Sequence, residues 1–381
     1  MIKAKLLFFC LIVSILAEGQ IYNIKEYGAI NDKETSSTKA IQQAIDLCVK
    51  NGGGTVFFPA GNYLSSTVVL GDNVEIKLGS GAKWYMSNNP EKYNITASIE
   101  NTGGGATPML IFAQDATNIS ISGKGKIIGQ PEYYEEPLTN YDFINEDYQT
   151  AIEAGLNPTA TRWKKPNVIP IFLSECNEIN IEGITIKDSP FWNIHLHWCN
   201  QVQINDIQLY SELGIAANSD GIDIDGCQNV TISDCIISTA DDAICMKTTK
   251  SKKGFKSCEN VTVTNCVLET SSCALKLGTE SYGDFKHILF NNCTIRNSNR
   301  ALGIFIRDGG SAENIIFSNI TAECTRYPVG WWGSAELMRF VVLKRNSDSK
   351  IGSIKNVLVK NIWANVEGTS RIKGFSDSNR I

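Results

Sequence analysis

From residue 116 onward, the chain repeats one short pattern of hydrophobic and polar positions. Each copy has a small residue, polar positions with Asn or a similar residue, and aliphatic-x-aliphatic on either side of a polar pair, as in CNEINIEGITI. Alternation with a period of two is typical of β-strands, not of helical or leucine-rich repeats. The first aliphatic positions of the eight copies are Ile119, Ile179, Val202, Val230, Val261, Ile288, Ile315 and Val357.

The spacing of these copies predicts the fold. From Ile179 onward the steps are 23, 28, 31, 27, 27 and 42 residues, which fits a coil of roughly two dozen residues with loop insertions. We therefore predict an all-β, single-domain right-handed parallel β-helix, a solenoid. Before the repeats, Ser37–Lys50 has the apolar spacing of an amphipathic helix, which we expect to cap the exposed apolar end of the first coil. Residues 52–87 contain short β-branched runs punctuated by Gly and Pro.

Two segments interrupt the repeat. Residues 131–167 form an acidic, aromatic-rich insertion with a helical pattern near residues 145–154. Such an insertion either builds one wall of a binding face or packs over the core. Trp331 and Trp332 lie in a second irregular stretch, residues 327–336, where they either stack on sugar rings or anchor the loop by packing.

The N-terminus has the pattern of a secretory signal. Lys3 and Lys5 precede an apolar run from Leu6 to Leu16, and small residues follow at Ala17 and Gly19. We expect residues 1–19 to be a signal peptide, residues 20–381 to be the β-helix domain, and the protein to be secreted or periplasmic. The run is too short to span a membrane, and no later segment is long enough either. A net charge of −5 gives no basic surface for nucleic acid.

The cysteines recur with the repeat. Twelve are present, and eleven remain once Cys10 of the signal is removed. No Cys-x-x-Cys pair predicts a zinc site. Stacked coils would align the thiols as buried ladders, which we expect to be free more readily than disulfide-bonded. The two sets that share a repeat position are Cys176, Cys199, Cys227 and Cys258, and Cys235, Cys266 and Cys293.

Two acidic clusters stand out between residues 218 and 247. Asp220 and Asp223 form the first, and Asp241 and Asp242 form the second, about one coil further along the chain. Adjacent coils would place the clusters about 4.8 Å apart. Crowded carboxylates cannot all ionise freely, and an acid next to a base is what hydrolysis of a glycosidic bond requires. The alternative is a pair of solvated turns, in which Asp is common.

These clusters carry a resemblance to a known family. Asn218-Ser219-Asp220 followed by Asp241-Asp242, together with YGAINDKETSSTKAIQQAID, GGGTVFFPAGNYL and KDSPFWNIHLHWCNQV, is similar to the polygalacturonase family, glycoside hydrolase family 28. The resemblance implies a right-handed parallel β-helix that hydrolyses pectic glycosidic bonds with inversion. It also implies that Asp241 is the general acid, that Asp220 and Asp242 hold and deprotonate the water, and that Asn218 contacts substrate.

The geometry must meet two conditions for these roles. Neighbouring strand residues face opposite ways, so Asp241 and Asp242 reach one cleft only where the chain bends, and Gly221 is a candidate for the matching break. An inverting site needs about 6.5–9.5 Å between acid and base. Asp223 is either a supporting carboxylate or, with Asp225, one of two solvated outward side chains.

Two motifs of the resembled family are altered. Ser272-Cys273-Ala274 stands where the family usually has Gly-His-Gly, so a histidine is missing. Phe305-Ile306-Arg307 stands where it usually has Arg-Ile-Lys, which leaves Arg307 as the cation for a substrate carboxylate. We therefore expect a divergent member of the family that prefers a pectic linkage other than plain polygalacturonan.

Other charged residues could replace the lost contacts. Lys276 and Glu280 lie near the altered histidine motif and are candidate substrate-binding residues, although as sequence alone they read as solvated charges. Arg307 could likewise be a surface charge. His195 and His197 are expected to be structural imidazoles.

The sequence thus predicts a secreted inverting glycoside hydrolase that acts on galacturonide or rhamnogalacturonan linkages, with exo action possible. We expect neither metal nor cofactor, because no loop combines several carboxylates at ligand spacing, and we expect a monomer. The alternatives are a β-helix pectate-type lyase, which would need a cation, and a non-catalytic glycan-binding solenoid. Crowded like charges argue against the latter.

Overall fold

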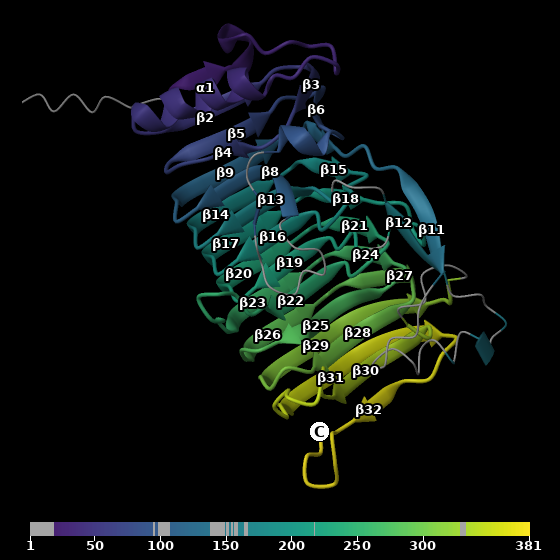
Figure 1. Cartoon of the computed structure of the whole chain (residues 1–381). Coiled ribbons are helices and arrows are strands. Elements are labelled where there is room, and N and C mark those ends of the chain that lie inside the picture. The colour runs from purple at the N-terminus through teal and green to yellow at the C-terminus, as the bar shows by residue number, and fades with distance from the viewer. Residues whose placement is uncertain are drawn as a thin grey trace, which may run out of the picture.

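The computed structural model shows a right-handed parallel β-helix that is closed at one end by a helix (Figure 1). It describes residues 19–93, 96–97, 107–137, 149, 152–153, 155, 159–163, 167–216, 218–327 and 333–381. The predicted fold class is therefore confirmed. The predicted signal peptide and the pair Trp331–Trp332 lie outside the described residues, apart from Gly19.

The strands form three parallel ladders that run along the solenoid. Two of them belong to a nineteen-stranded sheet and meet in the long strand β29. The first contains β1 (Ile21–Asn23), β2 (Gly54–Phe58), β5 (Val74–Leu78), β9 (Thr117–Gly123), β14 (Asn177–Glu182), β17 (Asn200–Asn205), β20 (Gln228–Ser233), β23 (Cys258–Thr264), β26 (Phe285–Asn291), β29 (Ser311–Cys324) and β31 (Ser353–Val366). The second contains β3 (Gly61–Ser65), β6 (Ala82–Met86), β10 (Lys126–Ile128), β15 (Thr185–Lys187), β18 (Gln208–Tyr210), β21 (Ile236–Thr239), β24 (Val267–Thr270) and β27 (Thr294–Ser298).

The third ladder is an eleven-stranded sheet, which carries the acidic clusters. This sheet includes a short strand, β7 (Thr96–Ala97), which pairs antiparallel with β8 (Thr107–Gln114). Its other members are β4 (Val68–Val69), β13 (Ile169–Ser174), β16 (Ile194–His197), β19 (Ile222–Asp225), β22 (Ile244–Thr248), β25 (Cys273–Ser281), β28 (Arg300–Ile306), β30 (Glu336–Val342) and β32 (Arg371–Lys373).

The register follows the repeat read from the sequence. The first aliphatic residues of successive copies pair with one another in all seven steps, from Ile119 with Ile179 to Ile315 with Val357. The residue before each of them has a positive φ, between 52° and 60°. Asn adopts this left-handed conformation more readily than most residues, which explains its frequency at that position. The alignment of the copies therefore predicted the stacking of the coils.

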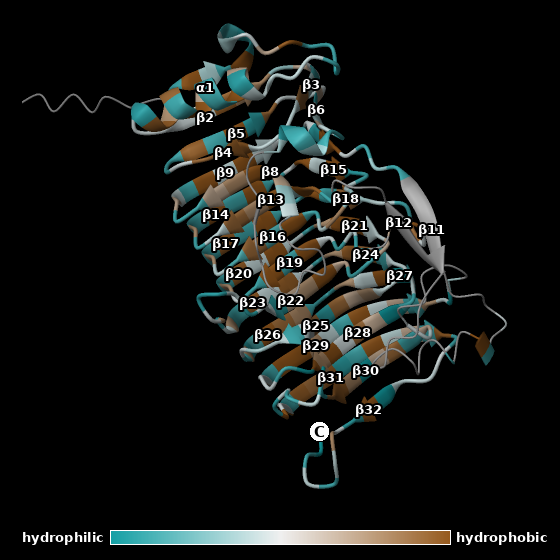
Figure 2. Cartoon of the chain, viewed as in Figure 1, coloured by the Kyte–Doolittle hydropathy of each residue, from teal (hydrophilic) through white to brown (hydrophobic). Residues whose placement is uncertain are grey.

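Apolar side chains of all three ladders fill the inside of the solenoid, and the alternation of apolar and polar residues is visible along the strands (Figure 2). Helix α1 (Thr38–Lys50) buries one face against the first coils through the residues that the spacing indicated, which are Ala40, Ile41, Ala44, Ile45 and Cys48. A short 3-10 turn, η1 (Ile24–Tyr27), packs beside this helix, and a second one, η2 (Pro90–Lys92), follows β6. The helix therefore caps the core, as predicted.

The expectation of free thiols is confirmed. All eleven cysteines among the described residues are free and buried. They stack between coils, as where the backbone N–H of Cys199 donates to Cys227 Sγ at 3.2 Å. Of the insertion at 131–167, the structure describes an antiparallel pair, β11 (Tyr133–Pro137) with β12 (Thr159–Trp163). Most of its helical pattern lies outside the described residues. Among the helices that the structure describes, none has the length and apolar character of a membrane span.

Candidate active site

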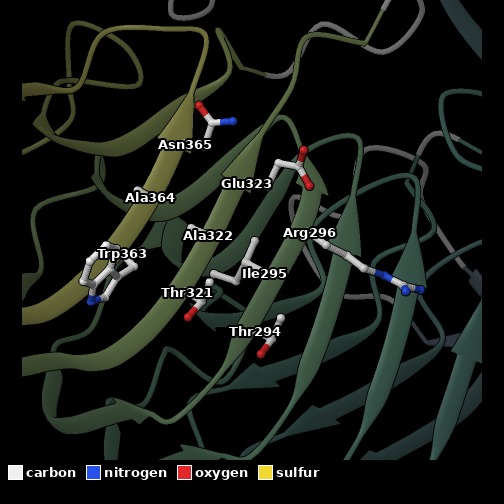
Figure 3. A pocket seen from close by; sticks show the side chains of 9 residues that line it. All are labelled: Thr294, Ile295, Arg296, Thr321, Ala322, Glu323, Trp363, Ala364 and Asn365. Carbon is white, nitrogen blue, oxygen red and sulfur yellow. The ribbon is translucent and has the colours of Figure 1, made fainter.

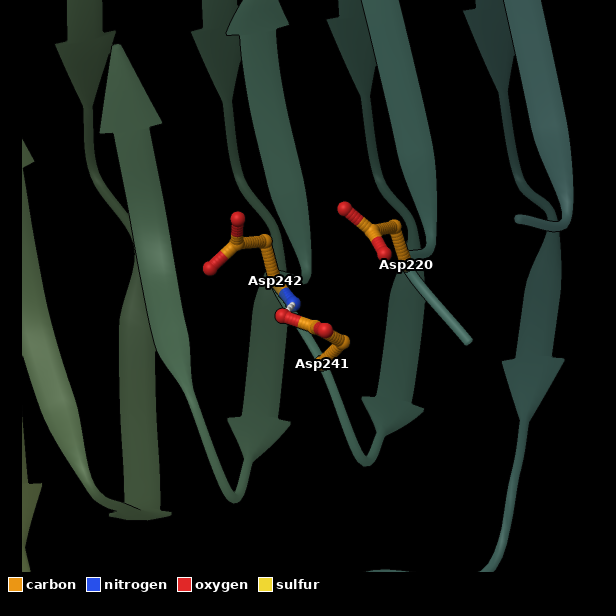
Figure 4. A group of neighbouring side chains, drawn as sticks. All are labelled: Asp220, Asp241 and Asp242. Atoms are coloured by element: carbon orange, nitrogen blue, oxygen red, sulfur yellow. Dashed lines mark hydrogen bonds between the residues drawn. The ribbon is translucent and has the colours of Figure 1, made fainter. Parts of the chain in front are cut away.

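The two acidic clusters meet where two central strands of the eleven-stranded sheet begin. Asp220 lies just before β19, and Asp241 and Asp242 lie just before β22, the next strand of the same sheet. The N–H of Gly221 donates to the carbonyl of Asp242 at 2.8 Å, so that Asp220 and Asp242 occupy the same level of neighbouring coils. One oxygen from each of the three carboxylates lies within 4.8 Å of the others (Figure 4).

The chain bends where these residues require it. Asp241 and Asp242 lie in the turn before β22, and the N–H of Asp242 donates to Asp241 Oδ1 at 2.8 Å (Figure 4). The N–H of Asn218 donates to Asp241 Oδ2 at 3.2 Å. A Cβ atom at Gly221 would lie 2.3 Å from the carbonyl oxygen of Ala243, so only glycine permits this approach of the two coils. The predicted bend is confirmed, and Asn218 orients the proposed acid.

The closest oxygens of the three carboxylates lie nearer to one another than the separation of whole carboxyl groups that is expected of an inverting site. Inverting sites usually have about 6.5–9.5 Å between carboxyl groups, and the closest oxygens here lie within 4.8 Å. Asp241 and Asp242 are consecutive residues of one turn, and Asp220 lies one coil away, at little more than the strand spacing. The separation alone therefore does not predict the stereochemistry of the reaction.

Asp242 is held in its ionised form. Its Oδ1 accepts a hydrogen bond from Ser272 Oγ at 2.9 Å, and its Oδ2 accepts one from Lys276 Nζ. Burial by itself raises the pKa of Asp242, but the charges of Lys276 and Lys247 and these hydrogen bonds outweigh it and lower the pKa below its ordinary value. A carboxylate in this state can accept a proton from water.

Asp241 and Asp220 are shifted in the opposite direction. Burial, followed by repulsion from Asp242, raises the pKa of Asp241. Burial, followed by repulsion from Asp223 and Asp241, raises the pKa of Asp220 well above its ordinary value. Asp241 is the most exposed of the three, at 9%. A carboxyl group that retains its proton beside one that has lost it is the arrangement of a general acid and a general base.

The idea that Asp223 and Asp225 are solvated outward side chains is wrong. Both are fully buried on the outer side of β19, because neighbouring loops cover this face of the sheet. His195 Nε2 lies 3.2 Å from Asp225 Oδ2, and burial is outweighed by hydrogen bonding from His195, which lowers the pKa of Asp225 to about 2. Burial raises the pKa of Asp223 to about 6. His195 and His197 are buried, as expected of structural imidazoles.

Lys276, Glu280 and Arg307 are not solvated charges either. The side chain of Lys276 is 13% exposed and that of Glu280 is 12% exposed, and Arg307 is 3% exposed as a residue. Lys276 binds Asp242 directly, so it supports the proposed base, which goes beyond the predicted role in substrate binding. Burial lowers the pKa of Arg307 to about 10, still well above neutral pH.

The altered motifs have visible consequences. Cys273, at the position of the missing histidine, is fully buried. Phe305, at the position of the missing arginine, lies under two cations, with its ring centre 5.6 Å from Lys276 Nζ and 5.0 Å from the guanidinium carbon of Arg300. The lost cation is therefore replaced by an aromatic surface beside other positive charges.

Sequence reasoning missed Lys247. Its Nζ lies 3.2 Å from Asp220 Oδ2 and 3.3 Å from Asp223 Oδ1, and its side chain is only 4% exposed. The signal was present, since a lysine ends the otherwise apolar run Ile244–Met246 directly after the acidic pair. Together with Lys276, it supplies the positive charge that these clustered carboxylates require.

A hollow of about 440 Å³ among the described residues lies elsewhere. It is formed over β27, β29 and β31 and includes Trp363, Arg296 and Glu323 (Figure 3). None of the predicted site residues lines it. It is on the outer side of the nineteen-stranded sheet, so we do not assign the reaction to it.

A comparison with known protein families identifies the family of this chain. The model of the family described as glycosyl hydrolases family 28 matches residues 92–375, which include all the predicted site residues. The chain belongs to glycosyl hydrolases family 28. A probable polygalacturonase of Vitis vinifera is 25% identical over 236 residues, which cover 59% of this chain and 44% of that protein. An exo-poly-alpha-D-galacturonosidase of Dickeya chrysanthemi is 23% identical over 257 residues, covering 60% and 42%.

This member of family 28 spans about half the length of the curated relatives that it matches. Solved structures share its fold. An exopolygalacturonase from Thermotoga maritima superposes with a TM-score of 0.75 at 23% identity, covering 94% of this chain and 84% of that one. A polygalacturonase from Erwinia carotovora gives 0.64 at 18% identity, covering 93% and 95%.

Proposed function

We propose that this family 28 protein is a glycoside hydrolase that cleaves pectic polysaccharide or oligosaccharide by general acid–base catalysis with inversion. The observation that carries the proposal is the opposite shift of two neighbouring carboxyl groups, with the pKa of Asp241 raised and that of Asp242 lowered. Membership of family 28 supports a hydrolase. The three carboxylates are also close enough to hold a metal ion, which is why chelation is among the tests below.

Each carboxyl group has one role in the proposed reaction. Asp241 donates its proton to the glycosidic oxygen as the bond between that oxygen and the anomeric carbon breaks. A water molecule held between Asp220 and Asp242 attacks the anomeric carbon from the opposite face and transfers a proton to Asp242. Asp241 ends deprotonated and Asp242 ends protonated, and exchange with solvent restores both.

The substrate follows from the charges around these acids. Lys276, Arg307 and Arg345 lie on the side of the site that leads toward the C-terminal coils, and cations of this kind bind the carboxylate of a uronate. Arg345 is already engaged, because its Nε donates to Asp308 Oδ1 at 2.7 Å. With Phe305 in place of one cation, we expect weaker binding of plain polygalacturonan than of another pectic linkage, such as rhamnogalacturonan or a short galacturonide.

Packing on the other side of the acids supports exo action. Toward the N-terminal coils, the outer face of the sheet is covered by a second apolar cluster that includes Phe172, Phe191 and Trp192, all at most 7% exposed. A substrate chain cannot continue through packed side chains. We infer that the site releases sugars from a chain end. The names of the exo-acting relatives agree with this inference.

The cellular setting is also part of the proposal. The signal pattern in residues 1–19 supports secretion or a periplasmic location, where the protein would meet cell-wall pectin. We propose that it acts there as a monomer.

Release of reducing ends from a panel of pectic substrates tests the function. The panel contains polygalacturonan, rhamnogalacturonan and short galacturonides, assayed with the wild type and Arg307→Ala. We expect the wild type to release terminal products, with a preference other than polygalacturonan, and Arg307→Ala to lose roughly one to two decades of affinity for acidic substrates. Rapid random depolymerisation of polygalacturonan, with no better substrate in the panel, would contradict the proposed specificity.

Stereochemistry is tested separately. Proton NMR of the first products from a short substrate distinguishes the two anomers before they interconvert. We expect the inverted anomer. The retained anomer would assign one carboxylate as a nucleophile, a role that the short spacing of the cluster also permits.

A further inference from the structure

Lys247 lies at the centre of a buried group of carboxylates. Its Nζ is 3.2 Å from Asp220 Oδ2, 3.3 Å from Asp223 Oδ1 and 3.8 Å from Glu280 Oε2. The same nitrogen lies 4.5 Å from the centre of the Trp192 ring, which covers it. The acids belong to the coils of β19 and β25, and Lys247 lies on β22 between them, so one ammonium group connects three successive coils.

This lysine holds Asp220 in one orientation. Asp220 Oδ2 accepts a hydrogen bond from Lys247, whereas Asp220 Oδ1 has no hydrogen-bond partner among the described residues. Both oxygens of Asp223 also lack a hydrogen-bonded partner in that part of the chain, and the ion pair with Lys247 is their nearest compensation. Without the lysine, these buried carboxylates would have no cation beside them.

Every charged group that faces Lys247 belongs to the site or supports it. They come from the coil before β22, from its own coil and from β25, and Lys276 is the second cation among them. Glu280 is shared with Arg345, whose Nη2 lies 3.4 Å from Glu280 Oε1. The remaining charged members that the structure describes are Asp220, Asp223, Asp241 and Asp242, and the buried thiol of Cys245 lies beside them.

We propose that Lys247 is a positioning residue, which fixes the carboxylates of Asp220 and Asp223 beside the reacting groups and sets the pH range of the reaction. This inference rests on the proposed function and adds to it, because the family resemblance pointed to acids and substrate cations but not to this lysine. The proposed water molecule would be bound through Asp220 Oδ1, the oxygen that the lysine leaves open.

The electrostatic consequence has a definite sign. A positive charge favours the ionised form of every nearby carboxyl group, so removing it raises their pKa values. The charge of Lys247 lowers the pKa of both Asp241 and Asp242. Both limbs of a bell-shaped pH profile must therefore move to higher pH when the charge is removed, the acidic limb with the base and the alkaline limb with the acid.

Comparing Lys247→Met with Lys247→Arg tests the proposal. For Lys247→Met we expect about tenfold or greater loss at the wild-type optimum, and a shift of both limbs by about one pH unit upward. Lys247→Arg keeps the charge and should restore the wild-type limbs. The matched control is Lys256→Met, which removes an exposed lysine 4.9 Å from the ring centre of Trp198 and should change neither rate nor profile.

A purely structural role gives a different result. If Lys247→Met lowers the rate equally at all pH values while both limbs stay in place, Lys247 only supports the fold and the proposal is overturned. Thermal unfolding of each variant identifies a loss of folded protein as the cause.

A second measurement does not depend on activity. Carbon-13 NMR titration of aspartate carboxyl groups, assigned with Asp223→Asn and Asp242→Asn, reports the pKa values directly. Higher pKa values of the buried aspartates in Lys247→Met support the proposal even if no pectic substrate is cleaved, which would overturn the proposed function alone. Unchanged values overturn the role of Lys247 while leaving the hydrolase proposal intact.

Discussion

Two regions on the outside of the solenoid differ in nearly every physical respect. Before strands β19 and β22 of the eleven-stranded sheet, the carboxyl groups of Asp220, Asp241 and Asp242 are at most 9% exposed. Two lysines contact this group. Over the last coils of the nineteen-stranded sheet, a hollow has a mostly apolar lining that includes Ile295 and Trp363, and Trp363 is 81% exposed. The second region is the more open, and the first contains the chemistry.

The difference shows what a reactive site requires in this fold. Ionisable groups in water are screened from one another and keep their ordinary pKa values. Buried groups interact strongly, so the pKa values of neighbouring carboxyl groups become different. Among the described residues around the hollow, Arg296 pairs with Glu269 at 3.3 Å while remaining 56% exposed, which is a weak surface interaction. The size of an opening is therefore a poor guide here, and the environment of the acids is a better one.

The largest effect should come from removing the proposed acid. Asp241→Asn should lower the turnover rate on an unactivated substrate by about 10²–10⁴-fold, because the leaving group would depart without a proton. Circular dichroism and thermal unfolding should remain as in the wild type, since a solenoid's stability is spread over many neighbouring contacts. Full activity of this variant would contradict the assignment.

A smaller loss of activity should follow when the cation beside the proposed base is removed. Lys276→Met removes a charge-assisted hydrogen bond from Asp242, so we expect roughly 10–100-fold lower activity and an acidic limb that moves to higher pH. Lys286→Met is a suitable control, because Lys286 pairs with Asp284 at the surface, away from the three acids. An unchanged acidic limb would show that Asp242 is not the group that titrates there.

Removing Asp223 should stabilise the protein at neutral pH. Its folded-state pKa of about 6 lies above the unfolded value of about 3.9, so the folded state binds more protons and wild-type stability rises as the pH falls from about 7 toward 4. Asp223→Asn should therefore unfold at higher denaturant concentration at pH 7.5, by up to ~3 kcal/mol in free energy. The difference should vanish below pH 4. Greater stability of the wild type at pH 7.5 would reverse the argument.

Chelation should have little effect on the rate. Lys247 and Lys276 already place positive charge against the acidic cluster, so we expect hydrolysis to continue after dialysis against EDTA. The measurement is reducing-end release before dialysis, after dialysis and after addition of Ca²⁺. Strict loss with EDTA and recovery with Ca²⁺ would indicate lyase chemistry, which is recognised by ultraviolet absorption of the unsaturated product.

The smallest effect should come from the hollow. Trp363→Ala should leave the rate on short substrates unchanged and alter the free energy of unfolding by at most about 0.5 kcal/mol, as is usual for exposed positions. A marked loss of activity would mean that the two regions are coupled and that the comparison drawn above is incomplete.

The fold was predictable because one physical rule recurs along the chain. Inward apolar positions must align between coils, so the repeat predicted the pairing of Val202 with Val230 and the other members of that row. The acids were predictable for a related reason, since Asp220 and Asp242 occupy corresponding points of adjacent coils. The bend at Asp241 followed from the same alternation.

The environment of the site was not predictable in this way. Whether Asp223, Glu280 or Arg307 is solvated depends on loops that cover the outer face of the sheet, and alternation within a strand says nothing about such cover. Lys247 was missed for the same reason, because a single lysine at the end of a strand is usually solvated. The close approach of the carboxylate oxygens depends on how the turn before β22 orients Asp241 and Asp242, which alternation along a strand does not specify.

The backbone hydrogen bond from Gly221 to Asp242 fixes the distance between Asp220 and Asp242 at the spacing of neighbouring strands. Catalytic spacing is therefore inherited from the scaffold, and substrate recognition is left to the turns that each coil carries. Loops that do not contact the acids can therefore differ in length between coils without moving them. In such an architecture, new specificity can arise by insertion at one point while the reaction itself stays unchanged.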